Sequence, residues 1–274
     1  MIRLQRSSLL LVFFLLTAAR GISAVPTESE EASPQSEKSA VVICLNGTGW
    51  PGLYTPDMPQ NARLLDSCAV GLIAGGRPGH GDSVRFWQTL SAGHGAATAA
   101  LHPTLRIEET GGARIPEMAE IREVNDNVFS QADPGLLGET LEESGIPRSL
   151  VLVGDDAVAA LLASDREGWI PAVLDLPAPI DGVGMASILE FVEARQGLVV
   201  VALSGSHGST EYLIDRLSQY VDEGDFFAVI SSPPGVGVGA GGLMGGIALK
   251  SLRHEAGLLE SASTRRAGFV SADD

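Results

Sequence analysis

The sequence predicts an α/β fold, with a mainly parallel β-sheet sandwiched between helices. From Ala40 onward, short runs rich in Val, Ile, Leu and Phe alternate with stretches of helical periodicity, which is typical of a parallel sheet covered by helices. The apolar runs are continuous rather than alternating, as expected for strands that are buried on both faces. The chain has 274 residues, of which 45% are hydrophobic, and this is enough to form a core of one or two domains.

The predicted strands are the continuous apolar runs, each only a few residues long. They are Val41–Leu45, Val70–Ile73, Leu150–Val153, Leu198–Leu203 and Phe226–Ile230. After the last of these, Gly235–Asp274 begins with a glycine-rich stretch and continues with strand-like sequence.

The predicted helices lie between the strands and gather apolar residues on one face. In the first helix, Ala62 and Leu65 are three residues apart and share a face, while Arg63 and Asp66 lie beside them. The helices are Asn61–Ser67, Val84–Ala100, Leu136–Ser144, Ala157–Ala163 and Thr210–Val221. Leu105–Asp133 contains no pattern that identifies a substrate.

Two segments precede this domain, which we assign to residues 40–274. Met1–Ala24 has a basic start, an apolar run of 11 residues from Leu9 to Ala19 and a small-residue end, the order of a secretory signal peptide. The run is shorter than the ~20 residues that span a bilayer, so a permanent membrane anchor is the weaker interpretation. Val25–Ser39 is rich in Glu, Ser and Pro and predicts a flexible acidic linker. We therefore expect a secreted or periplasmic protein without a membrane span once the signal is removed.

The charge and the cysteine content exclude several classes of protein. The formal net charge of −16 argues against nucleic acid as a partner, because a phosphate backbone would be repelled. The two cysteines, Cys44 and Cys68, are too few for a disulfide scaffold or a zinc ribbon. If their strands are adjacent, the two residues fall within bonding range; two buried thiols are the equal alternative.

Three short motifs have plain structural interpretations. Gly237–Gly242 matches G-x-G-x-x-G, but it follows two prolines and opens no helix, so a flexible loop is favoured. Ser204–Gly208 lacks the glycine that a nucleophile elbow needs two residues before Ser206. Asn46-Gly47-Thr48 is a glycosylation sequon, and a tight turn after a strand explains it better.

His80, Asp82 and Ser83 crowd the segment before the long predicted helix. Ser83 or Asp82 is a natural N-cap, whose side-chain oxygen accepts a helix N–H. A hydroxyl there also lies in the positive field of the helix N-terminus, which stabilises an alkoxide or a phosphate. The five histidines are scattered singly, without the spacing of a helical metal site.

Taken in order, several segments resemble the alkaline phosphatase superfamily, and more closely its phosphodiesterase-like branch and its secreted or membrane-tethered bacterial relatives. Val41–Gly47 looks like the strand that ends in a metal-binding Asp-Gly, and Ser83–Gly93 looks like the nucleophile helix. Pro134–Gly145 is similar to the helix before a central strand, and Gly257–Val270 to the segment that leads to the last helix. The resemblance covers most of residues 40–274 and implies an alkaline-phosphatase-like core.

The metal ligands that the resemblance implies are mostly missing. Asn46 stands where the first metal-binding Asp belongs, and an amide gives a divalent cation one weak oxygen and no charge. His207 is present, but Leu203 holds the place of the acid that precedes it. Ser231–Pro234 replaces an Asp-His pair. Two zinc ions need several carboxylates and imidazoles, so we expect a degenerate site.

Two functions follow from this resemblance. The first is a binding or cell-envelope module that has lost catalysis and recognises a small-molecule or envelope ligand. The alternative is a hydrolase or transferase of phosphate, phosphodiester or sulfate esters, with Ser83 as nucleophile, His80 as the nearest base and Asp82 beside them. In this alternative alone, zinc or manganese would bind near Asn46 and His207. The chain ends about where the family's final helix begins, which leaves a truncated product open.

Overall fold

The computed structural model describes residues 39–48, 67–74, 83–93, 95–96, 102–126, 132–204, 208–220, 225–233, 244–250, 257–258 and 269–271. Within them the main feature is a nine-stranded sheet with the strand order β11-β2-β10-β9-β1-β8-β5-β7, in which β12 also pairs with β2. These strands are β1 (Ser39–Asn46), β2 (Ala69–Ala74), β5 (Arg148–Val153), β7 (Val173–Leu176), β8 (Gly197–Ser204), β9 (Phe226–Ser231), β10 (Met244–Lys250), β11 (Gly257–Leu258) and β12 (Phe269–Ser271).

The central strands are parallel, as the sequence predicts. β1 lies between β8 and β9 and is parallel to both, and β5 is parallel to β8 and β7. β10 runs antiparallel to both of its neighbours, β2 and β9, so the sheet is mixed. Each of the five predicted strands is present, and each extends one or two residues beyond its predicted bounds at one or both ends.

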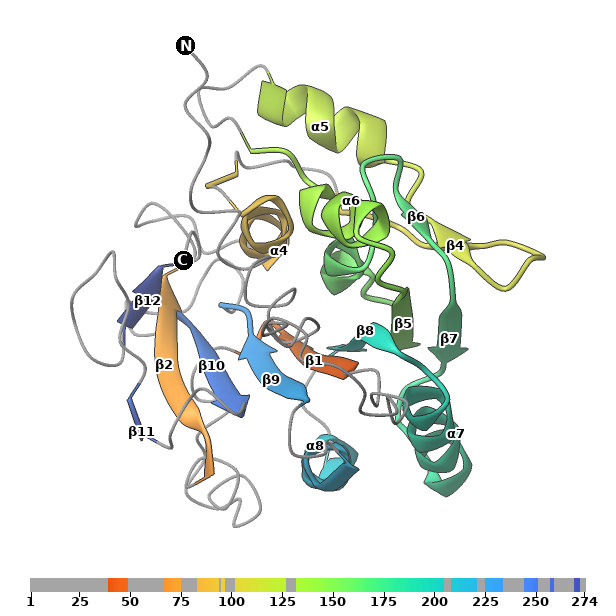
Figure 1. Ribbon diagram of the computed structural model, residues 1–274, viewed down its shortest axis with the longest axis vertical. Coiled ribbons are helices and arrows are strands. Elements are labelled where there is room, and N and C mark those ends of the chain that lie inside the picture. Colours follow the sequence, from red (N-terminus) through yellow and green to blue (C-terminus); the bar gives the residue numbers. More distant parts are fainter. Residues whose placement is uncertain are drawn as a thin grey trace, which may run out of the picture.

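Helices cover both faces of the sheet (Figure 1). One face packs against α4 (Ser83–Ala92), the 3₁₀ helix η1 (Val158–Leu162) and α6 (Leu136–Glu143), while α5 (Met118–Asp126) lies further out beside them. The other face packs against α7 (Gly182–Glu193) and α8 (Gly208–Tyr220). A second sheet of three short strands, β3 (Arg106–Ile107), β4 (Ala113–Arg114) and β6 (Trp169–Ile170), lies beside the first face. The predicted α/β sandwich is therefore confirmed.

Several predicted boundaries are wrong for local reasons. The helix predicted over residues 84–100 ends at Ala92, and Gly93 follows with φ of 61°, the left-handed conformation in which glycine ends helices. The segment 157–163 forms a 3₁₀ helix rather than an α-helix. Within the predicted helix 61–67, only Ser67 lies in the described residues, and it is helical. The predicted signal peptide and residues 25–38 of the linker lie outside them.

The two cysteines are not bonded. β9 and β10 separate the strand of Cys44 from β2, which Cys68 directly precedes. Cys44 lies in the core on the α4 face and Cys68 in the core on the α7 and α8 face. Both are buried free thiols. The premise that their strands are adjacent was wrong, and the alternative of two thiols is confirmed.

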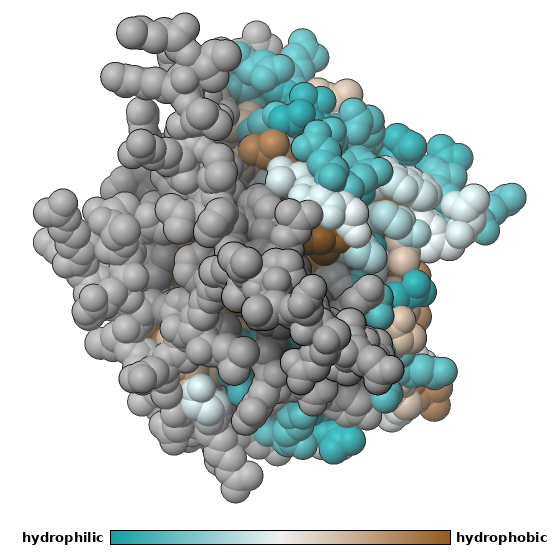
Figure 2. Space-filling model, viewed as in Figure 1, coloured by the Kyte–Doolittle hydropathy of each residue, from teal (hydrophilic) through white to brown (hydrophobic). Residues whose placement is uncertain are grey.

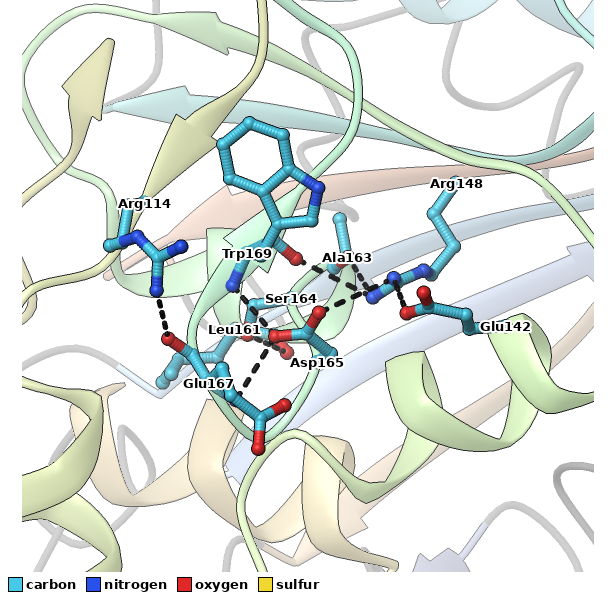
Figure 3. Close-up of polar contacts among 9 residues, drawn as sticks. All are labelled: Arg114, Glu142, Arg148, Leu161, Ala163, Ser164, Asp165, Glu167 and Trp169. Atoms are coloured by element: carbon cyan, nitrogen blue, oxygen red, sulfur yellow. Dashed lines mark hydrogen bonds and ion pairs between the residues drawn. The ribbon is translucent and has the colours of Figure 1, made fainter. Parts of the chain in front are cut away.

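A buried arginine links the main sheet to the elements beside it (Figure 3). Arg148, in β5, forms an ion pair with Glu142 of α6 at 2.5 Å and a longer one with Asp165 at 3.6 Å. Its guanidinium also donates to the carbonyls of Ala163 and Trp169. These contacts hold the segment between η1 and β6 against the sheet.

The surface near this region is mainly polar. Hydrophilic side chains gather over α5 and β4 in the space-filling view, whereas hydrophobic surface appears near β7 and α7 (Figure 2). Val183, near the start of α7, is 75% exposed. None of the helices in the described part of the chain is long and apolar enough to cross a membrane.

Candidate functional site

The carboxyl ends of β1, β8, β9 and β5 meet at one edge of the sheet, because these strands are parallel. In the register of the sheet, Asn46 at the end of β1 lies beside Ser204 of β8. Leu45 pairs with Ser231 of β9 on the other side. Ligands of open α/β sheets bind at such an edge, so these polar residues define the candidate site.

Asn46 faces the helix α4. Side chains alternate along β1, and Val42 and Cys44 pack on the α4 side of the sheet, so Asn46 continues that row. Its Oδ1 accepts a hydrogen bond of 2.5 Å from the indole Nε1 of Trp87, and its Nδ2 is buried without a hydrogen-bond partner. The residue as a whole is 6% exposed. Only one of the two polar atoms of this buried side chain therefore has a hydrogen-bond partner.

Trp87 is the residue of α4 that reaches the strand end. It is fully buried and packs edge to face against Phe86, with ring centroids 5.0 Å apart. Sequence reasoning missed its role, although its spacing is readable: Trp87 follows Ser83 by four residues, so the two share one side of the helix. The side of α4 that carries Ser83 therefore faces the end of β1.

Ser83 is the first residue of α4 and is half-buried. The hydroxyl thus lies in the first turn, where the partial positive charge of the helix is concentrated. His80, Asp82 and His207 lie outside the described residues. Of the candidate site residues from the sequence, the structure places Ser83 and Asn46, and both lie on the α4 side of β1.

The end of β9 is joined to the turn after β1 by hydroxyl groups. The backbone N–H of Gly47 donates to Ser232 Oγ at 2.9 Å, and Thr48 Oγ1 donates to Ser231 Oγ at 3.3 Å. The Ser232 N–H donates in turn to the carbonyl of Leu45 at 2.9 Å. Both serines are fully buried. The residues that replace an Asp-His pair in the resemblance thus serve to connect two strand ends.

On the side of β1 where β8 and β5 lie, a serine hydroxyl and one of two carboxylates form hydrogen bonds. Ser204 Oγ donates to the carbonyl of Val153 at 2.9 Å. After β5, Asp156 accepts from the Val158 N–H at 3.1 Å, a turn contact just before η1, while Asp155 is exposed. These two carboxylates follow the carboxyl end of β5, which is two strands from β1 in the sheet.

The described residues at this edge do not fit a zinc or manganese centre. Cations bind to oxygen or nitrogen lone pairs, yet the Oδ1 of Asn46 already receives an N–H, and the other side-chain atom is itself a donor. The neighbouring side chains of β9 are neutral hydroxyls. Among the described residues, no group of three or more His, Cys, Asp or Glu side chains is placed to hold a metal ion.

Two further buried amides lie behind the site. Gln88, next to Trp87, accepts from Asn125 Nδ2 of α5 at 3.5 Å, and Asn125 also donates to the carbonyl of Ile121 at 2.8 Å. Gln88 Nε2 has no partner.

On the strand, burial raises the pKa of Cys44 well above its ordinary value, so this thiol is no nucleophile near neutral pH.

No family model and no curated protein matches the chain. Several solved structures do match it. They include a protein in the alkaline phosphatase superfamily from Vibrio parahaemolyticus, at 11% identity and a TM-score of 0.47, covering 93% of this chain and 71% of that one. A cofactor-independent phosphoglycerate mutase from Thermoplasma acidophilum matches at 11% identity and a TM-score of 0.42, covering 86% and 97%. Human ectonucleotide pyrophosphatase/phosphodiesterase 5 matches at 9% and 0.45, covering 72% and 57%.

The first of these structures carries the name of the superfamily that the sequence resembles. At these identities the similarity concerns the fold alone. What the chain does is therefore argued from its own residues at the carboxyl edge.

Proposed function

We propose that the protein is a secreted or periplasmic binding protein with an alkaline-phosphatase-like core, which holds a small-molecule or cell-envelope ligand at the carboxyl edge without chemical turnover. The observation that supports this proposal is the hydrogen bond from Trp87 to Asn46 Oδ1. The bond places an N–H donor against the atom that would have to ligate a cation.

Ester hydrolysis by a serine requires help that the described residues at this edge do not supply. Phosphoryl and sulfuryl transfer needs groups that stabilise the charge on the equatorial oxygens and activate the hydroxyl. A metal pair does both in two-metal hydrolases. At the end of β1 and β9, the described side chains are an amide and hydroxyls, and the hydroxyls of Thr48 and Ser231 bond to each other. Such groups recognise a ligand by hydrogen bonds but add little charge stabilisation.

The competing function is ester hydrolysis or transfer with Ser83 as nucleophile. Its support is the position of Ser83 as the first residue of α4, on the side that faces β1. His80 would act as base, with Asp82 beside it, and zinc or manganese would bind near Asn46 and His207. This function and the binding function make opposite predictions for a single assay.

The test is an ester-hydrolysis assay of the full chain as a cell secretes or exports it. Aryl phosphate mono- and diesters and an aryl sulfate are offered with zinc, with manganese and without metal. We expect wild type and Ser83→Ala to show the same background rate in every condition. The matched control is Ser187→Ala, which removes a hydroxyl that donates to the Val183 carbonyl on the remote helix α7. Metal-dependent turnover that disappears in Ser83→Ala but persists in Ser187→Ala would establish the hydrolase instead.

A further inference from the structure

Trp87 determines which way the amide of Asn46 points. An indole N–H is a donor only, so it can face the carbonyl oxygen of the amide but not the NH₂ group. The bond of 2.5 Å between Trp87 Nε1 and Asn46 Oδ1 therefore turns Nδ2 away from the indole. Rotation of the amide would place two donors against each other.

The Nδ2 group that results is a donor without an acceptor. It is buried and has no hydrogen-bond partner, which is unfavourable for any polar group withdrawn from water. Buried polar groups in folded proteins almost always have partners, and one without a partner needs an explanation. At the edge where a sheet of this kind binds its ligands, the explanation we favour is an acceptor that arrives with the ligand.

We propose that Asn46 Nδ2 donates to an oxygen of an uncharged ligand that carries hydroxyl or carbonyl groups, such as a saccharide, and that Trp87 is the positioning residue for this contact. This inference rests on the proposed binding function and names its ligand class. The site thus presents a donor where a cation site would present an acceptor.

The neighbouring groups favour an uncharged ligand over an anion. Ser232 contributes a neutral hydroxyl at the same turn, whereas Ser231 pairs with Leu45, which packs on the opposite face of the sheet, and its hydroxyl bonds to Thr48. Asp155 and Asp156 follow β5, two strands from β1 in the sheet, which is about 10 Å at the usual strand spacing. Carboxylates at that distance repel an anion, whereas they accept hydrogen bonds from ligand hydroxyls.

The experiment observes the side-chain amide protons directly, by ¹⁵N-edited NMR of the full chain. The Asn46 signals are assigned by their loss in Asn46→Asp, which keeps the shape but replaces the donor with an acceptor. Gln88 Nε2 is the internal control, since it is also buried without a partner but lies beside Asn125 of α5. The probes are N-acetylglucosamine, which is uncharged, and inorganic phosphate.

We expect N-acetylglucosamine to shift the Asn46 amide signals and to leave those of Gln88 in place, while phosphate shifts neither. Trp87→Phe keeps an aromatic ring, though a smaller one, and removes the N–H, so the amide can rotate, and the probe should bind at least about tenfold more weakly. The inference would be overturned by a response to phosphate alone or by no response to either probe. It would also be overturned by an internal water that contacts the Asn46 amide and persists with the probe present.

These outcomes are separate from those of the ester assay. Turnover in that assay would end the proposed binding function even if the Asn46 amide responded to the uncharged probe. Absence of turnover together with a silent Asn46 amide would end only the inference about the ligand class.

Discussion

At the scale of single residues, the identity of position 46 decides which hydrogen-bonding groups the end of β1 presents. An aspartate there would offer two acceptor oxygens, one for the indole of Trp87 and one for a cation. Asparagine instead offers one acceptor oxygen, which already receives the Trp87 N–H, and an NH₂ group that only donates. Changing a single atom from oxygen to nitrogen thus turns one acceptor of this side chain into a donor.

The cysteine thiols give a pH-dependent prediction at this scale. Burial raises the pKa of Cys44 well above its ordinary value, and burial also raises the pKa of Cys68, where a hydrogen bond from Ser67 and the charge of Lys250 act in the opposite direction. The thiolate is the reactive form. We expect both thiols to react with dithionitrobenzoate far more slowly in the native protein than in urea, with Cys68 reacting first as the pH rises. Rapid native reaction at pH 8, or faster reaction of Cys44, would contradict this.

At the scale of secondary-structure elements, local signals account for some differences between prediction and structure. α7 was not predicted, yet Asp181 caps it by accepting from the Gly184 N–H at 2.7 Å, and Met185, Ile188 and Val192 are its buried residues. That cap and spacing were readable in the sequence. By contrast, η1 is a 3₁₀ helix of entirely buried residues that packs with α4 in the core on one face of the sheet, and its local sequence did not distinguish it from an α-helix.

The turn after β5 supplies a prediction about an element end. Gly154 has φ of 83°, and a Cβ there would overlap Ser204 Oγ, which donates to Val153. Gly111 has a similar φ of 85°, but a Cβ would meet nothing within 4 Å. We expect Gly111→Ala to lower the free energy of unfolding by about 1 kcal/mol, from backbone strain alone. Gly154→Ala should lower it by about 1–3 kcal/mol more, because the Ser204 bond is lost.

Urea unfolding of the two variants measures this difference. Equal losses for Gly154→Ala and Gly111→Ala would mean that the Ser204 side chain moves away without cost. In that case the contact between the ends of β5 and β8 would not help to shape the edge.

At the scale of the whole molecule, Arg148 connects the main sheet with the smaller elements on its α4 side (Figure 3). Its side chain is 2% exposed and contacts Asp165, which is 8% exposed, and Glu142, which is 60% exposed. Asp165 also accepts from the N–H groups of Glu167 and Trp169. The guanidinium therefore belongs to a buried network that spans α6, β5 and the segment before β6.

We expect Arg148→Met to lower the free energy of unfolding by about 3–5 kcal/mol, because it leaves Asp165 charged and buried without its cation. Glu142→Gln is the matched control and should change it by less than about 1 kcal/mol, since that carboxylate is mainly exposed. Urea unfolding compares both variants with wild type. Similar small effects of the two changes would show that the network does not hold the smaller sheet in place.

The order of the strands lies beyond what local sequence encodes. Continuous apolar runs identified β1, β2, β5, β8 and β9, because burial on both faces demands such composition wherever a strand lies. Those runs carry no information about which strands are neighbours in the sheet. The expectation that Cys44 and Cys68 are close assumed that their strands are neighbours in the sheet. It was wrong because β9 and β10 lie between those strands.

The sequence by itself determined the α/β class, five strands of the main sheet and the position of Ser83 at the start of a helix. These features depend on composition and periodicity within a few residues. Only the tertiary structure brought Trp87 to Asn46, 41 residues apart in the chain, and joined Ser232 to the turn after β1. Contacts of this kind depend on how strands and helices pack, and packing is a property of the folded chain as a whole.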